Sequence, residues 1–153
     1  MQRKSVLRIL MVAIAMMVCF VLAGASAMAQ SDTHLGDRRC SNRTLFGDYA
    51  SQIEGTILGP NLPIRGLAMA HFDGKGNITQ VDHIVFNGIP PAEEWTPGTG
   101  TYSVNPDCTG SAVINSPSGQ GPVNLHFVVV SHGKQINQVV DANAVTAVAY
   151  KVD

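Results

Sequence analysis

The feature that most constrains this chain is a series of short segments in which apolar and polar residues alternate, broken at close intervals by turn residues. In the segment 44–54, Leu45, Tyr49 and Ile53 fall on one face, as the twofold side-chain period of a half-buried strand requires. Beyond residue 42, no window shows the apolar spacing of an amphipathic helix. The sequence therefore predicts an all-β domain in which helix is a minor element.

The most secure pair of strands is predicted on either side of the turn sequence DGKGN at 73–77. The two glycines of this turn allow the positive φ angles that a tight hairpin requires. Centring the hairpin on the turn places His71 opposite Ile78. The two flanking strands are predicted at 64–72 and 78–86.

A long loop is predicted at 87–97, because this stretch contains three prolines and has no period. Pro90 and Pro91 have no N–H to donate to a central ladder. After the loop, strands are predicted at 98–104, 110–115, 123–131, 135–140 and 144–152. The chain thus has about eight strands joined by short connections.

This number of sequential strands predicts how the sheet is closed. An open antiparallel sheet exposes two edges, and closure into a ring removes both. We therefore predict a single antiparallel up-and-down barrel, with a two-sheet β-sandwich as the alternative. An eight-stranded barrel has room inside either for side chains or for one small ligand, and the pattern does not distinguish the two.

Residues 1–29 have the organisation of a secretory signal peptide. Three basic residues precede an apolar, uncharged run at 9–22, and Ala27-Met28-Ala29 offers a cleavage site. We predict a signal peptide at 1–29, a flexible leader at 30–42 that is tied down at Cys40, and a barrel domain at 43–153. The expected location is secreted or periplasmic, with no membrane span after cleavage. An uncleaved anchor is the alternative, although the run is shorter than the about 20 residues a span needs.

The cysteines support export. Cys19 lies within the predicted signal peptide, which leaves Cys40 and Cys108 in the expected mature chain. An even pair of cysteines in an exported domain predicts a disulfide. The alternatives, a metal site or a nucleophilic cysteine, lack a partner at ligand spacing or an evident activating base.

Charge and histidine spacing exclude two classes of partner. Removing residues 1–29 takes away three of the ten Lys and Arg residues and none of the eleven Asp and Glu residues, which leaves a formal charge of about −4. Such a chain lacks the basic footprint of a nucleic-acid-binding protein. The five histidines show neither H-x-H nor H-x₃-H spacing, so we predict no metal site and no cofactor.

Two segments, 128–130 and 144–149, are apolar on both faces. Strands of this kind are often covered on their outer side as well, by a loop or by a second subunit. A homo-oligomer is therefore one of the expected arrangements.

No short catalytic motif is present, such as G-x-S-x-G, H-E-x-x-H, a Walker loop or a dinucleotide fingerprint, so we assign no catalytic residue. Tyr49 and Tyr102 lie in predicted strands and could act as proton donors. Trp95 lies in the proline-rich loop, where functional groups commonly sit on β scaffolds. These three residues are the candidates for ligand binding.

Three segments resemble a group of exported bacterial proteins that have no established activity. The segments are C-S-N-x-x-L-x-G-x-Y at 40–49, H-F-D-G-K-G-N at 71–77 and G-T-Y-S-V-N-P-D-C-T-G at 100–110. At the level of the fold, the strand pattern is similar to small barrels of the calycin and allene oxide cyclase kinds. Lipocalins carry G-x-W in the first strand, whereas this chain has Tyr49 in the corresponding place.

We consider three hypotheses for the function. The first is an exported, non-enzymatic barrel that binds a small apolar ligand or serves as a surface interaction module. The second is a cyclase- or isomerase-like enzyme that acts on an apolar substrate inside the barrel, with Tyr49, Tyr102 and Glu54 as candidates. The third is a structural envelope protein. Because fold analogy does not determine activity, the contents and surfaces of the barrel have to decide among them.

Overall fold

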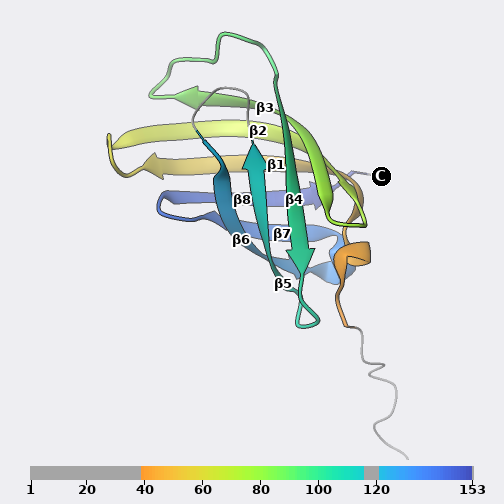
Figure 1. The fold of residues 1–153 in the computed structure, drawn as a ribbon. Coiled ribbons are helices and arrows are strands. Elements are labelled where there is room, and N and C mark those ends of the chain that lie inside the picture. Colours follow the sequence, from red (N-terminus) through yellow and green to blue (C-terminus); the bar gives the residue numbers. More distant parts are fainter. Residues whose placement is uncertain (1–38, 116–120, 153) are drawn as a thin grey trace, which may run out of the picture. The chain divides into compact units, whose positions relative to one another are not determined.

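The described part of the chain, residues 39–115 and 121–152 of this computed structural model, forms one closed antiparallel β-barrel (Figure 1). Its strands follow one another around the barrel in sequence order, and the last pairs back with the first. The strands are β1 (Phe46–Ile57), β2 (Leu62–Asp73), β3 (Asn77–Phe86), β4 (Thr96–Val104), β5 (Thr109–Asn115), β6 (Val123–Val130), β7 (Gln135–Val140) and β8 (Ala144–Lys151). The helical elements of the described residues are two 3₁₀ turns, η1 (Asn42–Thr44) and η2 (Ser131–Gly133).

This architecture confirms the predicted all-β, up-and-down barrel of about eight strands in place of the β-sandwich. It is also consistent with the calycin-like fold that the resemblance implied. The predicted signal peptide at 1–29, with Cys19, and most of the predicted leader at 30–42 lie outside the described residues. Among the residues that the structure describes, no helix is long and apolar enough to cross a membrane.

Strands on opposite sides of the barrel cross one another. In Figure 1, β1, β2 and β3 run across the view, while β4 and β5 pass in front of β7 and β8 at a steep angle. Every ladder around the ring is antiparallel, and paired residues share one face. One set of alternate residues therefore points into the core and the other set points to the outside.

The predicted hairpin at 73–77 forms, but its register differs by one residue from the predicted one. Phe72 pairs with Ile78, so that His71 lies opposite Thr79. The predicted pairing of His71 with Ile78 is wrong because it joins an outward-facing residue to an inward-facing one, which the pleat does not allow. Burial of the apolar pair Phe72 and Ile78 selects the observed register.

The carboxylate of Asp73 organises the turn of this hairpin. One of its oxygens accepts hydrogen bonds from the backbone N–H groups of Lys75, Gly76 and Asn77 at 2.7, 2.9 and 2.9 Å, and the other accepts from the Asn77 side chain at 2.6 Å. Gly74 and Gly76 have φ angles of 72° and 119°, in the region that favours glycine. The bond from the Asn77 side chain and those from the backbone hold the pKa of Asp73 well below its ordinary value.

Replacing Asp73 by asparagine should destabilise the barrel at neutral pH and weaken its dependence on acid. Because the folded-state pKa of Asp73 is depressed, its contribution is fully present above the ordinary carboxylate pKa of about 4 and is lost as the pH falls toward the lower, folded-state value. Urea-unfolding midpoints at a series of pH values measure both effects. Glu93→Gln, in the exposed loop, controls for the loss of one charge. Equal midpoints of Asp73→Asn and the unmodified protein at neutral pH would contradict this role.

The core fills the end of the barrel that carries η1 and η2. Tyr49 and Tyr102 each contact Phe72 edge to face, with ring centroids 5.1 and 5.0 Å away. Buried side chains from the end of η1 and from other strands complete the same core cluster, among them Leu45, Ile78, Val104, Phe127, Val129 and Ile136. At this end, the interior is therefore occupied by side chains.

Two inward-facing glycines allow large neighbours to lie against the wall of the barrel. A Cβ at Gly110 would overlap the ring of Phe127, its partner on β6. A Cβ at Gly100 would overlap the carbonyl oxygen of Val113 and the side chain of Ile114. Glycine at these positions reflects close approach of neighbouring atoms.

Cys40 and Cys108 form the predicted disulfide, with Cα atoms 5.0 Å apart. The bridge joins the residues before η1 to the turn between β4 and β5. The backbone N–H of Cys40 also donates to the carbonyl of Pro106 at 3.1 Å. This end of the predicted leader is thus anchored to the barrel.

Candidate functional site

The two predicted tyrosines lie together in the core. Tyr49 is completely buried, and its hydroxyl donates to the carbonyl of Gly133 in η2 at 2.5 Å. The hydroxyl of Tyr102 shares its proton between the carbonyl oxygens of Asn42 and Leu45, each 3.0 Å away. Both hydroxyls are therefore bonded to the backbone that closes this end of the barrel.

The surroundings of these tyrosines disfavour proton transfer at neutral pH. Burial raises the pKa of Tyr49 above its ordinary value. Burial, together with the nearby charge of Asp73, raises the pKa of Tyr102 to about 12. Each phenol keeps its proton and uses it in a structural hydrogen bond.

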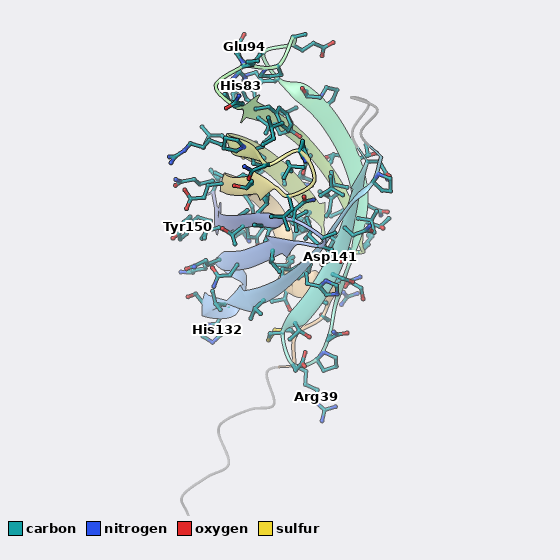
Figure 2. All side chains as sticks on the ribbon, turned by 90° about the vertical axis from the view of Figure 1, so that its left-hand side faces the viewer. Arg39, His83, Glu94, His132, Asp141 and Tyr150 are labelled. Carbon is teal, nitrogen blue, oxygen red and sulfur yellow. A yellow bond between two sulfur atoms is a disulfide. The ribbon has the colours of Figure 1, made fainter. Side chains whose placement is uncertain are left out.

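The structure does not bring Trp95 to the tyrosines. Its side chain is 46% exposed, just before β4, with its ring edge-on to His83 at a centroid distance of 6.1 Å. The Nδ1–H of His83 donates to the carbonyl of Glu94 at 2.6 Å, because a carbonyl can only accept. Figure 2 places His83 and Glu94 at one end of the barrel and His132, in η2, at the other.

The sequence-based prediction assigned no role to two inward-facing polar residues of β3. Gln80 and Asp82 lie opposite Ala70 and Ala68 of β2, and Gln80 Nε2 donates to Asp82 Oδ2 at 2.9 Å. Burial raises the pKa of Asp82. In the sequence, Gln80 and Asp82 fall on the same strand face as Ile78. Placing that face inside the barrel required the correct hairpin register.

The outer surface carries an apolar row that crosses five adjacent strands. The register pairs Tyr150 with Ala50, Ala50 with Met69, Met69 with Val81, and Val81 with Pro97. All five side chains, which we call the outer apolar row, are exposed. Figure 2 shows Tyr150 projecting outward from β8.

A shallow groove of about 310 Å³ borders this row on β1, β2 and β3. Leu67, which is 56% exposed, lies in it next to Gln52 and His83. Glu54 and Arg65 are directly paired on the same outer face. Glu54 therefore lies outside the barrel, away from the two buried tyrosines.

A second and larger groove, of about 530 Å³, lies on the outer face of β5, β6 and β7. Ser111 and His126 line it and are directly paired across β5 and β6. The Nδ1 atom of His126 lies 2.9 Å from Asp141 Oδ1, in the turn after β7. Val128 and Val139 supply apolar wall, and Asn137 supplies an amide.

A second histidine–aspartate pair lies on β1 and β2. The Nδ1 atom of His71 is 2.7 Å from Asp48 Oδ1, and both side chains are exposed.

Across residues 39–115 and 121–152, no three His, Cys, Asp or Glu side chains gather closely enough to hold a metal ion.

In comparisons with known proteins, neither a protein-family model nor a curated protein sequence matches this chain. The features that bear on function are therefore the filled end of the barrel, the outer apolar row and the two grooves.

Proposed function

We propose that the protein is an exported β-barrel that serves as a surface interaction module, and that its outer apolar row binds a second copy of the chain. The single observation that carries this proposal is the unbroken apolar row across β8, β1, β2, β3 and β4. A contiguous apolar patch on an exposed sheet face commonly marks an interaction site. The disulfide supports an oxidising, extracytoplasmic location.

The registers make this face self-complementary. A twofold axis that runs along the strands, midway between β1 and β2, sets each residue of β1 against the β2 residue that pairs with it in the other copy. Ala50 then faces Met69, so that a large side chain meets a small one. On the same axis, Glu54 faces Arg65 and brings opposite charges together. These matches favour a second copy over an unrelated partner.

The observed placement of the predicted site residues supports a surface function over a ligand in the interior. Tyr49 and Tyr102 are bonded to backbone carbonyls, and their rings help to fill the closed end. Glu54, one of the candidates of the cyclase-like alternative, is exposed on the outer face. The apolar-ligand alternative predicts that a small molecule stays with the protein in native mass spectrometry and leaves on denaturation.

Replacing Met69 by lysine should shift the protein from dimer to monomer. Met69 is 40% exposed in the middle of the row, and a dimer would place it close to the axis in both copies. Full burial of such a side chain contributes about 1.5–3 kcal/mol, and each of the two copies would lose the part of this that comes from the exposed 40%, so the dissociation constant should rise by roughly tenfold. Sedimentation velocity over a range of concentrations measures this change. Val139→Lys, on the outer face of β7, is the matched control and should leave the dimer unchanged.

A charge exchange tests the proposed axis independently. Glu54→Arg alone would face Arg65 of the other copy and should weaken the dimer, whereas Glu54→Arg combined with Arg65→Glu should restore it. If the unmodified protein sediments as a monomer at every concentration, or if Val139→Lys dissociates it while Met69→Lys does not, the proposed interface is wrong.

A further inference from the structure

Two residues that line the larger groove, Ser111 and His126, are of the types that serve as nucleophile and base in many hydrolases, and Asp141 contacts His126 as the orienting carboxylate does in such sites. Ser111 on β5 and His126 on β6 are directly paired and point outward. Side chains paired in this way have Cβ atoms about 4.5–5.5 Å apart, a spacing that lets a serine hydroxyl reach an imidazole nitrogen by rotation. Asp141 contacts the same imidazole from the turn between β7 and β8.

The contact with Asp141 determines which nitrogen of His126 is available as a base. An ionised carboxylate only accepts hydrogen bonds, so Nδ1, at 2.9 Å from Asp141 Oδ1, carries the proton. In the neutral ring, Nε2 is then left with a lone pair. This is the tautomer in which a histidine removes the proton of a serine hydroxyl.

The groove beside these residues provides room for a substrate. Its volume of about 530 Å³ suits a small molecule, and Val128 and Val139 give it an apolar wall. Asn137 also lines the groove, and its Oδ1 accepts from Gln135 Nε2 at 2.8 Å. The Nδ2 donors of Asn137 are thereby left for a bound molecule.

The barrel contains a natural comparison for this arrangement. His71 also has Nδ1 against an aspartate, Asp48 at 2.7 Å, and lies opposite a hydroxyl residue, Thr79. That hydroxyl is on a β-branched side chain, which is restricted in rotation. These three residues do not line either of the two grooves. This second pair therefore has the same histidine–aspartate contact without either groove beside it.

We propose that Ser111, His126 and Asp141 form a hydrolytic site for small carboxylic esters with a short apolar acyl group. The Ser111 oxygen attacks the ester carbonyl carbon while His126 Nε2 takes the hydroxyl proton. The C–O bond to the alcohol breaks, and His126 gives this proton to the departing oxygen. Water then attacks the acyl-serine and gives a proton to His126, which returns it to Ser111 as the carboxylic acid leaves.

The position of Ser111 in the sheet limits the range of substrates. Ser111 lies in a strand that is paired on both sides, so the backbone N–H groups near it belong to the ladders and do not form an oxyanion hole. Without that stabilisation, the carbonyl has to be activated by a good leaving group. We therefore expect cleavage of aryl esters and none of amides.

The test uses the full mature protein with p-nitrophenyl butyrate and, separately, with a fluorophosphonate probe that labels activated serines. Labelling at Ser111, located by peptide mass spectrometry, is the expected result. Ser111→Ala and His126→Gln should each lower the rate of ester cleavage by at least about 100-fold, the lower bound for general-base assistance. All three side chains are exposed, so circular dichroism should confirm that the variants fold.

His71→Gln is the matched control, because it removes a histidine with the same contact on another face. It should leave both the rate and the labelling unchanged. Absence of a label on Ser111, a Ser111→Ala rate equal to that of the unmodified protein, or equal losses in His126→Gln and His71→Gln would each overturn the proposal. The last two outcomes would assign ester cleavage to surface imidazoles in general.

Discussion

Replacing Cys40 and Cys108 together by serine is expected to lower the free energy of unfolding by about 4 kcal/mol. The two cysteines are 68 residues apart in the sequence, and a bridge over a loop of this length removes much of the conformational freedom of the unfolded chain. Domains of this size are stable by only about 5–15 kcal/mol, so the change would remove a large part of the total. Urea unfolding of the two proteins, without reductant, measures it.

The double replacement is a cleaner experiment than a single one, because it leaves no free thiol to form bridges between molecules. Reduced unmodified protein is the matched control and should unfold at the same urea concentration as the double variant. The entropic account would fail if the double variant unfolded at the midpoint of the oxidised protein.

Truncating Tyr49 to alanine should cost about 3–5 kcal/mol, the range for removing a large aromatic side chain from a core. Tyr49 is completely buried, contacts Phe72 edge to face, and holds η2 through its bond to Gly133. Tyr49→Phe keeps the ring and leaves the buried carbonyl of Gly133 without this donor, so it should cost about 1–3 kcal/mol. Unfolding by urea at low protein concentration, where any dimer has dissociated, separates the two contributions.

Tyr150→Ala provides the matched control for this pair of variants. Tyr150 is 56% exposed on the outer face of β8, and surface changes of this kind usually stay within about 0.5 kcal/mol. A Tyr150→Ala variant as unstable as Tyr49→Ala would mean that the ring of Tyr49 has no special part in the core.

Local patterns in the sequence were sufficient to predict the strands, the barrel and the disulfide. The alternation in 44–54 and the glycines of the turn at 73–77 act over a few residues, and the structure confirms both elements. The hairpin register was missed by one residue because a turn of this length allows more than one pairing. Burial of Phe72 against Ile78, which is a tertiary property, decides between them.

The candidate sites were harder to predict than the fold. Tyr49 and Tyr102 were correctly placed in strands, but their bonds to Gly133, Asn42 and Leu45 depend on how η1 and η2 close the barrel. The outer apolar row joins residues from five strands, and each ladder adds its own register. Ser111 and His126 belong to strands whose connection does not determine their pairing. Such constellations become visible only after all the registers are known.

The order of the strands also concentrates the difficulty of folding in one step. Seven ladders join strands that are neighbours in sequence, and each can form as a local hairpin. The eighth joins β1 to β8 and pairs Ala50 with Tyr150, which are 100 residues apart. Loop-closure entropy opposes this contact until the rest of the sheet has curved, so we expect ring closure to be slow and late. The β1–β8 ladder is therefore the one contact between neighbouring strands that no local hairpin can supply.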